Sequence, residues 1–279
     1  MLESPSRRIY RRLFKPAPWR RWTASTRALP DFLVIGAMRA GTTTLHDLIC
    51  RHPRVVPAIG KEIHFFDLNY PKGERWYRAH FPPAEKLRRI EGITGEASPY
   101  YLFHPAAPAR AADLVPAAKI VAVLRHPVER AHSHYWHTVR HKAEPLAFDE
   151  ALDREPDRLA GEEDRILAEA GYTGHAHQHH SYQARSSYAG QLARWLDRYP
   201  RERVLVLEQR RFFGAPEAGA GRLFEFLELD PHPVPSPRRF NEAGYPPMAP
   251  ETRERLLAHF APHNARLFDL LGERFDWDD

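Results

Sequence analysis

Glycine, arginine and threonine gather in residues 36–44, Gly-Ala-Met-Arg-Ala-Gly-Thr-Thr-Thr, directly after a run of apolar residues. Glycines let the backbone turn sharply and approach a ligand, and a helix that begins there offers unpaired N–H groups and the positive end of its dipole. Arg39 adds a cation with a fork of donors, and the threonine hydroxyls add further donors. The pattern predicts a phosphate-binding loop. The alternative is a plain tight turn between a strand and a helix.

The spacing of this loop is close to that of the nucleoside triphosphatase P-loop, G-x-x-x-x-G-K-[ST], but Thr42 stands at the lysine position. Triphosphatases also end a later strand with an aspartate that helps to hold Mg²⁺. Here the corresponding apolar run, residues 119–124, is followed by Arg125. Both differences argue against a kinase or hydrolase that uses metal-assisted triphosphate chemistry, which we keep as an alternative.

A second candidate anion site begins at Arg125, at the end of that apolar run. Open α/β sheets bind ligands at the carboxyl ends of their strands. Pro127 begins a predicted helix, and Ser133 lies about two turns along it. Two phosphate sites at adjacent strand ends indicate a nucleotide that carries phosphates on separate oxygens.

Between the two sites, residues 61–67 (Lys-Glu-Ile-His-Phe-Phe-Asp) place three ionisable side chains among aromatic ones. Such surroundings shift pKa values, and a carboxylate here could remove a proton from an acceptor hydroxyl. If the segment is extended, Glu62 and His64 share one face. The alternative is an ordinary strand end without a catalytic role. Asp67 is the third ionisable group of the segment.

The elements that must position these residues alternate between strands and helices. Each predicted strand is a continuous apolar run, which is typical of a parallel sheet covered on both faces. We therefore expect an α/β fold, a P-loop-like three-layer α/β/α domain with a mostly parallel central sheet and a helical insertion. Strands are predicted at 31–37, 55–56, 93–97, 119–124 and 203–207, and helices at 42–51, 74–80, 105–114, 128–140, within 148–199, at 223–229 and, as one helix or a pair, at 251–271.

The net charge of +5 is concentrated at the amino end of the 279-residue chain. Residues 1–30 hold eight basic side chains and one acidic one, whereas residues 31–279 hold 33 basic and 35 acidic ones. The chain therefore divides into a basic extension, 1–30, and a nearly neutral domain, 31–279, which argues against nucleic-acid binding through bulk charge. The extension is either solvated and loosely packed or a contact with an anionic membrane surface. No apolar run is long enough to span a bilayer, so a cytoplasmic location is expected, with peripheral membrane contact through the extension as a variant.

Together, the loop 36–43, the segment 61–67 and the stretch 124–133 resemble the sulfotransferase superfamily, in particular its heparan sulfate N- and 3-O-sulfotransferase-like branch and bacterial relatives. Residues 95–100 (Gly-Glu-Ala-Ser-Pro-Tyr) and 188–196 are also similar to segments of that family. The resemblance runs from about residue 30 to the end of the chain. It implies transfer of a sulfuryl group from 3′-phosphoadenosine 5′-phosphosulfate (PAPS) to a hydroxyl or amine of a glycan or another small acceptor.

The resemblance also implies roles for individual residues. Glu62 matches the general base, and His64 and Asp67 match neighbours that assist it. The 5′-phosphate would lie against Arg39, which replaces the family's loop lysine, and against Ala40, Gly41, Thr42, Thr43 and Thr44. The 3′-phosphate would meet Arg125 and Ser133, and Arg238 and Arg239 match the adenine-side loop loosely. No metal is required, because the leaving group is already an acidic phosphate.

Two further features bear on the function. Ala97 stands where the 3-O enzymes carry a lysine, so a cation that belongs to the family's site is missing. Together with the arginine-rich extension, this supports a second alternative, a non-catalytic module that binds polyanionic glycan or membrane. Residues 175–180 (His-Ala-His-Gln-His-His) have no cysteine or acidic partners at metal-site spacing, which favours a surface or acceptor-cleft role over a metal site.

Overall fold

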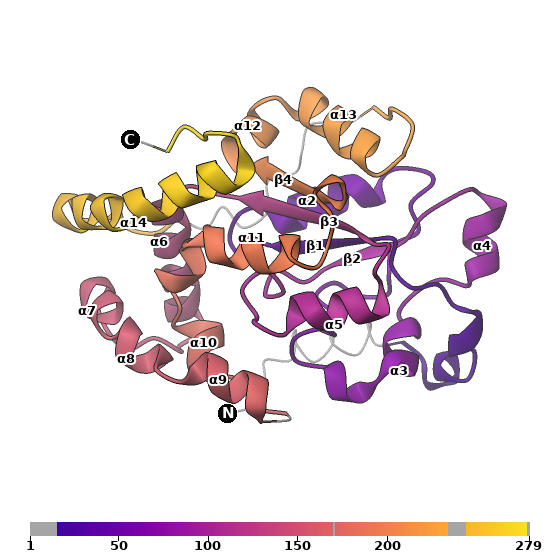
Figure 1. Cartoon of the computed structure of the whole chain (residues 1–279), viewed down its shortest axis with the longest axis horizontal. Coiled ribbons are helices and arrows are strands. Elements are labelled where there is room, and N and C mark those ends of the chain that lie inside the picture. Colours follow the sequence, from indigo (N-terminus) through magenta and orange to yellow (C-terminus); the bar gives the residue numbers. More distant parts are fainter. Residues whose placement is uncertain (1–15, 170, 234–243, 278–279) are drawn as a thin grey trace.

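The computed structural model describes residues 16–169, 171–233 and 244–277. At its centre is a four-stranded parallel sheet in the order β2-β1-β3-β4 (Figure 1). The predicted parallel sheet is confirmed, but Val55 makes only an isolated bridge to Ile93 in place of a fifth strand. The strands are β1 (Phe32–Gly36), β2 (Gly95–Ala97), β3 (Lys119–Leu124) and β4 (Val204–Glu208).

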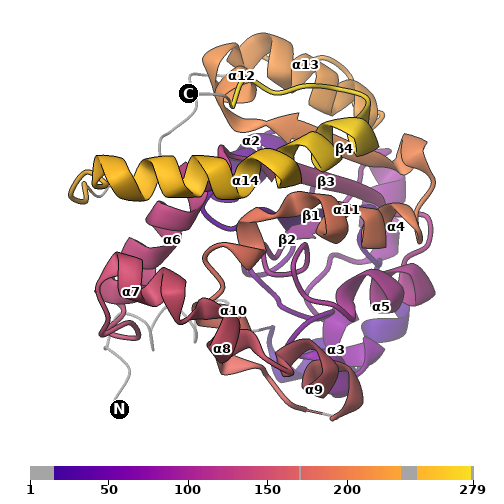
Figure 2. The ribbon, with the colours of Figure 1, turned by 60° about the vertical axis from the view of Figure 1, so that its left-hand side comes forward.

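Helices cover both faces of the sheet, which is why nearly every strand residue is buried. The chain crosses from β1 to β2 in one direction along the sheet and from β2 to β3 and β3 to β4 in the other. Because parallel crossovers are right-handed, α2 (Thr42–Cys50) falls on one face, and α5 (Ala107–Leu114) and α11 (Tyr188–Leu196) fall on the other (Figures 1 and 2). The predicted three-layer α/β/α architecture is confirmed.

The predicted helical insertion lies between β3 and β4 and forms an arm beside the sheet (Figure 2). A second apolar cluster, with Val128, Tyr182 and Phe260 among its members, joins this arm to the last helix. That helix is continuous, so residues 250–271 form one helix and no pair. The insertion contains α6 (Pro127–Arg140), α7 (Phe148–Asp153), α8 (Glu155–Leu159), α9 (Glu162–Ala168), α10 (His175–His179) and α11; the other helices are α3 (Glu74–Arg78), α4 (Ala84–Arg89), α12 (Gln209–Gly214), α13 (Pro216–Phe226) and α14 (Pro250–Leu271).

The part of the basic extension that the structure describes, residues 16–30, is attached to the domain by specific contacts. The Arg20 guanidinium donates hydrogen bonds to the carbonyl oxygens of Ala79 and Phe81, at 2.6 and 2.7 Å. Arg27 is 4% exposed and also donates to the Phe81 carbonyl. The expectation of a loosely packed extension is therefore wrong for these residues, because their arginines satisfy carbonyl groups of the domain. Residues 1–15 lie outside the described part.

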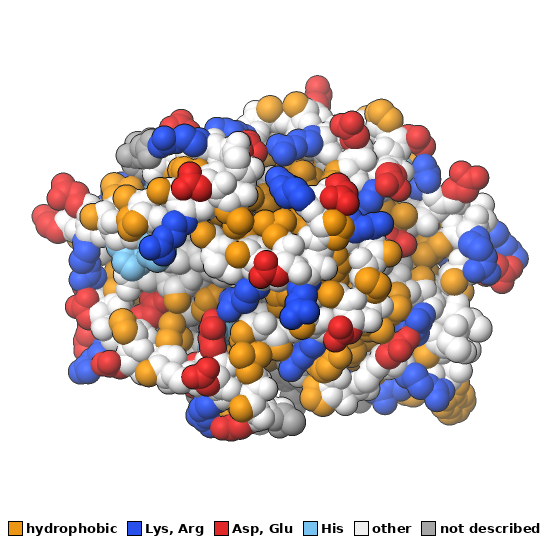
Figure 3. All heavy atoms as spheres, in the orientation of Figure 1, with side chains coloured by type: hydrophobic (Ala, Val, Ile, Leu, Met, Phe, Trp, Pro, Cys, Tyr) orange, Lys and Arg blue, Asp and Glu red, His pale blue; other side chains and the backbone are white. Residues whose placement is uncertain are grey.

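Basic and acidic side chains alternate over the face of the domain in Figure 3, in keeping with the near-neutral charge of residues 31–279. Among the described residues, no helix combines the length and the apolar character that crossing a bilayer requires.

Candidate functional site

A cleft of about 1010 Å³ lies at the carboxyl ends of the strands. Because the strands are parallel, the loops that follow them meet at the same edge of the sheet. Each of the four loops contributes to the lining: Arg39 after β1, Tyr100 after β2, Arg125 after β3 and Gln209 after β4. This volume is large enough for a nucleotide together with part of an acceptor.

The predicted phosphate loop lies in this cleft at the start of α2. Gly41 precedes the helix with a φ of 94°, and a Cβ at this position would approach the Phe213 ring to 2.6 Å, so only glycine fits here. The N–H groups of the first helical turn have no intrahelical acceptors and are available to an anion. Gly41, Thr42, Thr43 and Thr44 line the cleft, whereas Ala40 is fully buried and its N–H donates to the Ala37 carbonyl.

The structure brings Arg39, Arg125 and Ser133 together, although they come from two separate motifs. Arg39 Nε donates to Ser133 Oγ at 3.0 Å, and Arg125 donates to the Arg39 carbonyl oxygen at 3.4 Å. Burial lowers the pKa of Arg39, and the neighbouring positive charges of Arg140 and Arg125 lower it further. This cluster of cations is suited to a phosphate.

Arg125 also has neutral and acidic neighbours that orient it. Its guanidinium lies 3.5 Å from a Glu129 carboxylate oxygen and 3.5 Å from the Tyr245 hydroxyl. Glu129 in turn accepts a hydrogen bond from Arg253 at 2.8 Å. Arg238 and Arg239 lie outside the described residues, so their predicted place beside the adenine stays a prediction.

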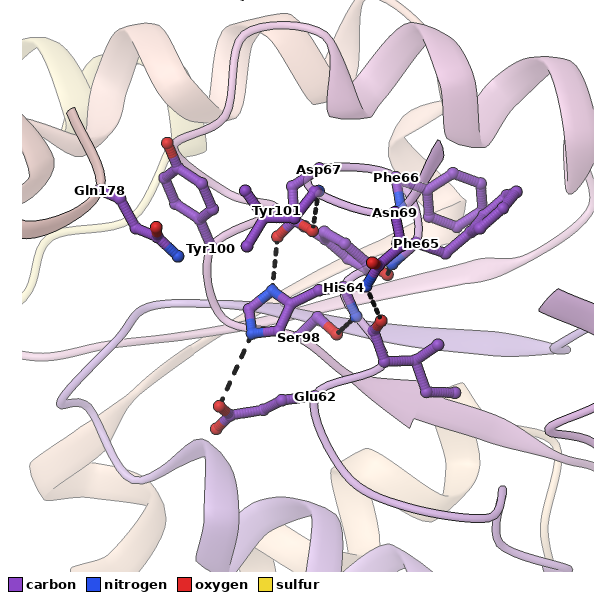
Figure 4. A network of polar contacts seen from close by, with 12 residues as sticks. Glu62, His64, Phe65, Phe66, Asp67, Asn69, Ser98, Tyr100, Tyr101 and Gln178 are labelled. Atoms are coloured by element: carbon purple, nitrogen blue, oxygen red, sulfur yellow. Dashed lines mark hydrogen bonds and ion pairs between the residues drawn. The ribbon is translucent and has the colours of Figure 1, made fainter. Parts of the chain in front are cut away.

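Glu62, His64 and Asp67 lie in a row, with the His64 ring between the two carboxyl groups (Figure 4). His64 Nδ1 is 2.7 Å from Asp67 Oδ2, and His64 Nε2 is 3.7 Å from Glu62 Oε2. Burial alone would lower the pKa of His64, but the two carboxylates outweigh it and raise that pKa to about 10. Burial would raise the pKa of Glu62, but His64 and the Lys61 ammonium outweigh it and lower that pKa to about 2. At neutral pH Glu62 is therefore a carboxylate and His64 an imidazolium.

The backbone that carries these side chains is not extended, which corrects the geometry on which their expected common face rested. Glu62 and His64 have φ values of 59° and 53°, in the left-handed region, yet their side chains still meet. Two hydrogen bonds from side chains that follow β2 fix this loop: the His64 N–H donates to Ser98 Oγ at 3.0 Å, and the Phe65 N–H donates to the Tyr101 hydroxyl at 2.7 Å.

A buried carboxylate in β2 supports that arrangement. Glu96 is 1% exposed and accepts hydrogen bonds from the hydroxyls of Ser98, Tyr101 and Tyr77, each at 2.7 Å. Because the Ser98 and Tyr101 hydroxyls donate their protons to Glu96, their oxygen lone pairs are left to accept hydrogen bonds from the N–H groups of His64 and Phe65. Glu96 was missed as a site residue, and the signal that could have identified it is a glutamate inside a three-residue buried strand.

Lys61 was also missed. Its ammonium donates to the hydroxyl of Thr43 in the phosphate loop and lies 3.4 Å from Glu62 Oε1. Further residues that were not predicted as site residues line the cleft: Met38, Pro99, Tyr100, His137, Gln178, His179, Arg185, Gln209, Arg210, Phe213, Gly214, Gly244 and Tyr245.

The histidine-rich stretch 175–180 reaches the cleft at one end. Gln178 and His179 line the cleft, as the acceptor-cleft interpretation predicts, while His177 is buried and hydrogen-bonds through Nδ1 to the Tyr100 hydroxyl at 2.7 Å. Among the described residues, no three His, Cys, Asp or Glu side chains lie together in a way that could hold a metal ion.

The sequence of this chain is similar to those of a known protein family. A sequence model of the sulfotransferase domain matches residues 29–261. The membrane-associated sulfotransferase kil1 of Dictyostelium discoideum is 26% identical over 317 residues, covering 90% of this chain and 67% of kil1. Human heparan sulfate glucosamine 3-O-sulfotransferase 3B1 is 28% identical over 280 residues, covering 91% of this chain. The alignment covers 66% of the human enzyme, so this chain spans about two thirds of the length of these two relatives.

The fold agrees with these matches. A crystal structure of a sulfotransferase from Alicyclobacillus acidocaldarius is 31% identical, with a TM-score of 0.68, and the match covers 90% of this chain and all of that one. The predicted resemblance to the heparan sulfate branch is confirmed as a distant homology. The chain therefore belongs to the sulfotransferase domain family and is a sulfotransferase family enzyme.

Proposed function

We propose that this protein transfers a sulfuryl group from PAPS to a hydroxyl group, with Glu62 as the general base. The observation that carries the proposal is the presence, in one cleft, of a phosphate loop, a second cluster of cations and an ionised carboxylate. A nucleotide with phosphates on two separate oxygens requires the first two features, and an acceptor hydroxyl requires the third.

The donor would place its 5′-phosphosulfate against Gly41, Thr42, Thr43 and Thr44, and its 3′-phosphate against Arg125 and Ser133. The short distance between the Arg39 guanidinium and Ser133 supports this arrangement, because it leaves the cations of the second site directly beside the loop. Backbone N–H groups and cations that point at the leaving phosphate stabilise the charge that develops on it. Arg39, which contacts Ser133, would instead strengthen the binding of the 3′-phosphate, because partial burial lowers the local dielectric constant.

In the reaction, the acceptor oxygen forms a bond to sulfur while the bond between sulfur and the 5′-phosphate oxygen breaks. The acceptor proton passes to Glu62, and the electron pair of the broken bond stays on 3′,5′-adenosine bisphosphate (PAP), the product. Glu62 is ready to accept a proton because it is ionised at neutral pH. His64 orients it as an imidazolium, and the buried Asp67 carboxylate fixes the His64 ring.

For the acceptor, we propose a glycan or another small hydroxylated molecule, with an amine as the alternative group. The support is that several relatives act on heparan sulfate by name and that Tyr100, Gln178, His179 and Arg185 line the cleft with hydrogen-bonding groups.

The described part of the extension supports a second proposal, contact with an anionic membrane surface. Arg20 and Arg27 hold the segment against the domain, while Trp19 and Trp22 are 52% and 80% exposed. Tryptophan favours the membrane interface, and neighbouring basic residues favour anionic lipids. The relative kil1 is described as membrane-associated. The cytoplasmic location expected from the sequence stays a prediction.

Thermal unfolding tests the donor. PAP is expected to raise the Tm of the protein, because a ligand that binds the native state stabilises it, whereas ATP with Mg²⁺ is expected to raise it far less. The reverse preference would support the phosphotransferase alternative and contradict the proposal.

A further inference from the structure

The reacting end of the cleft lies between the first turn of α2 and the Glu62 carboxylate. If the 5′-phosphate binds at that first turn and the acceptor hydroxyl at Glu62, the sulfuryl group must lie between them during transfer. Its three terminal oxygens and the bridging oxygen carry negative charge, which is most effectively stabilised by a cation at that point.

Arg39 does not supply this cation in the structure. It is the cation of the phosphate loop itself, but its Nε donates to Ser133 Oγ, and its neighbours Arg125 and Arg140 belong to β3's loop and to α6. Its guanidinium therefore belongs to the second cluster of cations. The β2 end offers no cation either, because Ala97 is fully buried and apolar.

Lys61 occupies the missing position. Its ammonium donates to Thr43 Oγ1, at the start of α2, and lies 3.4 Å from Glu62 Oε1. It thus links the phosphate loop to the proposed base. Its side chain is 30% exposed and that of Glu62 is 46% exposed. An ion pair at this exposure contributes little to stability, so stabilisation of the fold is a weak explanation for the position of Lys61.

Resting on the function proposed above, we propose that Lys61 is a further catalytic residue, whose ammonium contacts the transferring sulfuryl group and the oxygen that it leaves. The step needs no additional proton transfer: the acceptor oxygen bonds to sulfur, the bond from sulfur to the phosphate oxygen breaks, the acceptor proton goes to Glu62, and Lys61 stays protonated throughout. An ammonium suits this role, because its compact charge and three rotatable donors can follow the sulfuryl group from one oxygen to the other.

Movement of the Lys61 ammonium toward the sulfuryl group would also change the pKa of Glu62. Lys61 is one of the groups that hold the pKa of Glu62 down in the free enzyme. When the ammonium turns toward the sulfuryl group, this effect on Glu62 weakens and the pKa of Glu62 rises, while the contact with His64, the larger cause, continues to hold it below its ordinary value. Binding of PAPS would therefore make Glu62 a stronger base, so that donor binding promotes removal of the acceptor proton.

The test compares Lys61→Met and Lys61→Arg with Lys86→Met, a control that removes an exposed lysine from α4. Calorimetry gives the Kd of PAP, which lacks the sulfuryl group, and of PAPS. Chromatography gives the rate at which saturating PAPS is converted to PAP, with or without an acceptor. For Lys61→Met we expect the binding of PAP to weaken less than the binding of PAPS, and a conversion rate lower by about 10²–10³-fold. Lys61→Arg should recover part of the rate, and Lys86→Met should match the unmodified protein.

Two results would overturn the proposal. A Lys61→Met variant that converts PAPS at the unmodified rate would show that the ammonium does not contact the reacting atoms. A variant that loses PAP and PAPS affinity equally would reduce Lys61 to a structural contact of the phosphate loop. If the unmodified protein itself binds no PAP, the proposed function fails first, and the inference about Lys61 fails with it.

Discussion

Nδ1 of His64 lies 2.7 Å from Oδ2 of Asp67, a carboxylate whose side chain is completely buried. This contact fixes the orientation of the ring, so that Nε2 faces Glu62 at 3.7 Å on the cleft side (Figure 4). The outcome is a positively charged imidazolium between two negative charges. It explains how His64 can stay protonated and how Glu62, the proposed base, can stay ionised at the same end of the cleft.

Replacing Asp67→Asn tests this relationship through the pH dependence of stability. His64 has a pKa of about 10 in the folded protein and 6.5 ordinarily, so its protonation stabilises the fold fully below 6.5, and this contribution is lost as the pH rises toward 10. In the Asp67→Asn variant the folded pKa should fall toward 6.5. Urea unfolding at neutral pH and near pH 10 should show a smaller loss of stability on alkalinisation in the variant. Equal losses in both proteins would contradict the arrangement.

Arg125→Met tests the second cluster of cations. Losing a charged hydrogen bond to a phosphate costs about 1.5–3 kcal/mol, which corresponds to an increase of about 10- to 100-fold in the Kd of PAP. Adenosine 5′-phosphate, which lacks the 3′-phosphate, should lose little affinity. Arg198→Met, at an exposed position beyond α11, is the control for the loss of one positive charge. If both nucleotides weaken equally, Arg125 does not bind the 3′-phosphate.

Intrinsic fluorescence tests the membrane proposal. Trp195 and Trp277 are buried and Trp76 and Trp136 are half-buried, so Trp19 and Trp22 are the strongly exposed tryptophans. Vesicles that contain phosphatidylserine should shift the fluorescence emission of Trp19 and Trp22 to the blue, and added salt should reduce this shift.

The matched variants for that experiment are Trp22→Ser and Leu167→Ser. Leu167 is 60% exposed on α9, so its replacement removes an exposed apolar side chain from another part of the protein. Only Trp22→Ser should reduce co-sedimentation with the vesicles. Binding that is equal for phosphatidylserine and phosphatidylcholine vesicles, or that both variants reduce, would refute the proposed contact surface.

The sheet and the loops at its edge were predictable from the sequence because β1, β3 and β4 consist mainly of continuous apolar residues. The strand predicted at 119–124 matches β3 residue for residue, and the parallel pairing of β1 with β3 places Arg39 near Arg125. Local sequence patterns were sufficient for these features, because a short, continuous apolar run is typical of a strand that is buried on both faces of a parallel sheet.

The site between the loops was harder to predict, because its geometry depends on long-range contacts. The left-handed backbone at Glu62 and His64 is held by Ser98 and Tyr101, which Glu96 orients from the next strand. Lys61 reaches a threonine that lies 18 residues earlier in the chain. Neither set of contacts can be inferred from the spacing of residues along the chain. The sequence therefore indicated which residue types belong to the site, but not which residues contact one another.

The central claim is that Glu62 removes the acceptor proton during transfer from PAPS. The direct measurement incubates ³⁵S-labelled PAPS with a panel of glycans and small phenols and counts the label in each product, using Glu62→Gln and, as the control, Glu85→Gln on α4. We predict transfer by the unmodified protein and by Glu85→Gln. For Glu62→Gln we predict unchanged affinity for PAP and a transfer rate lower by about 10²–10⁴-fold. A Glu62→Gln variant that transfers label at the unmodified rate would contradict the account.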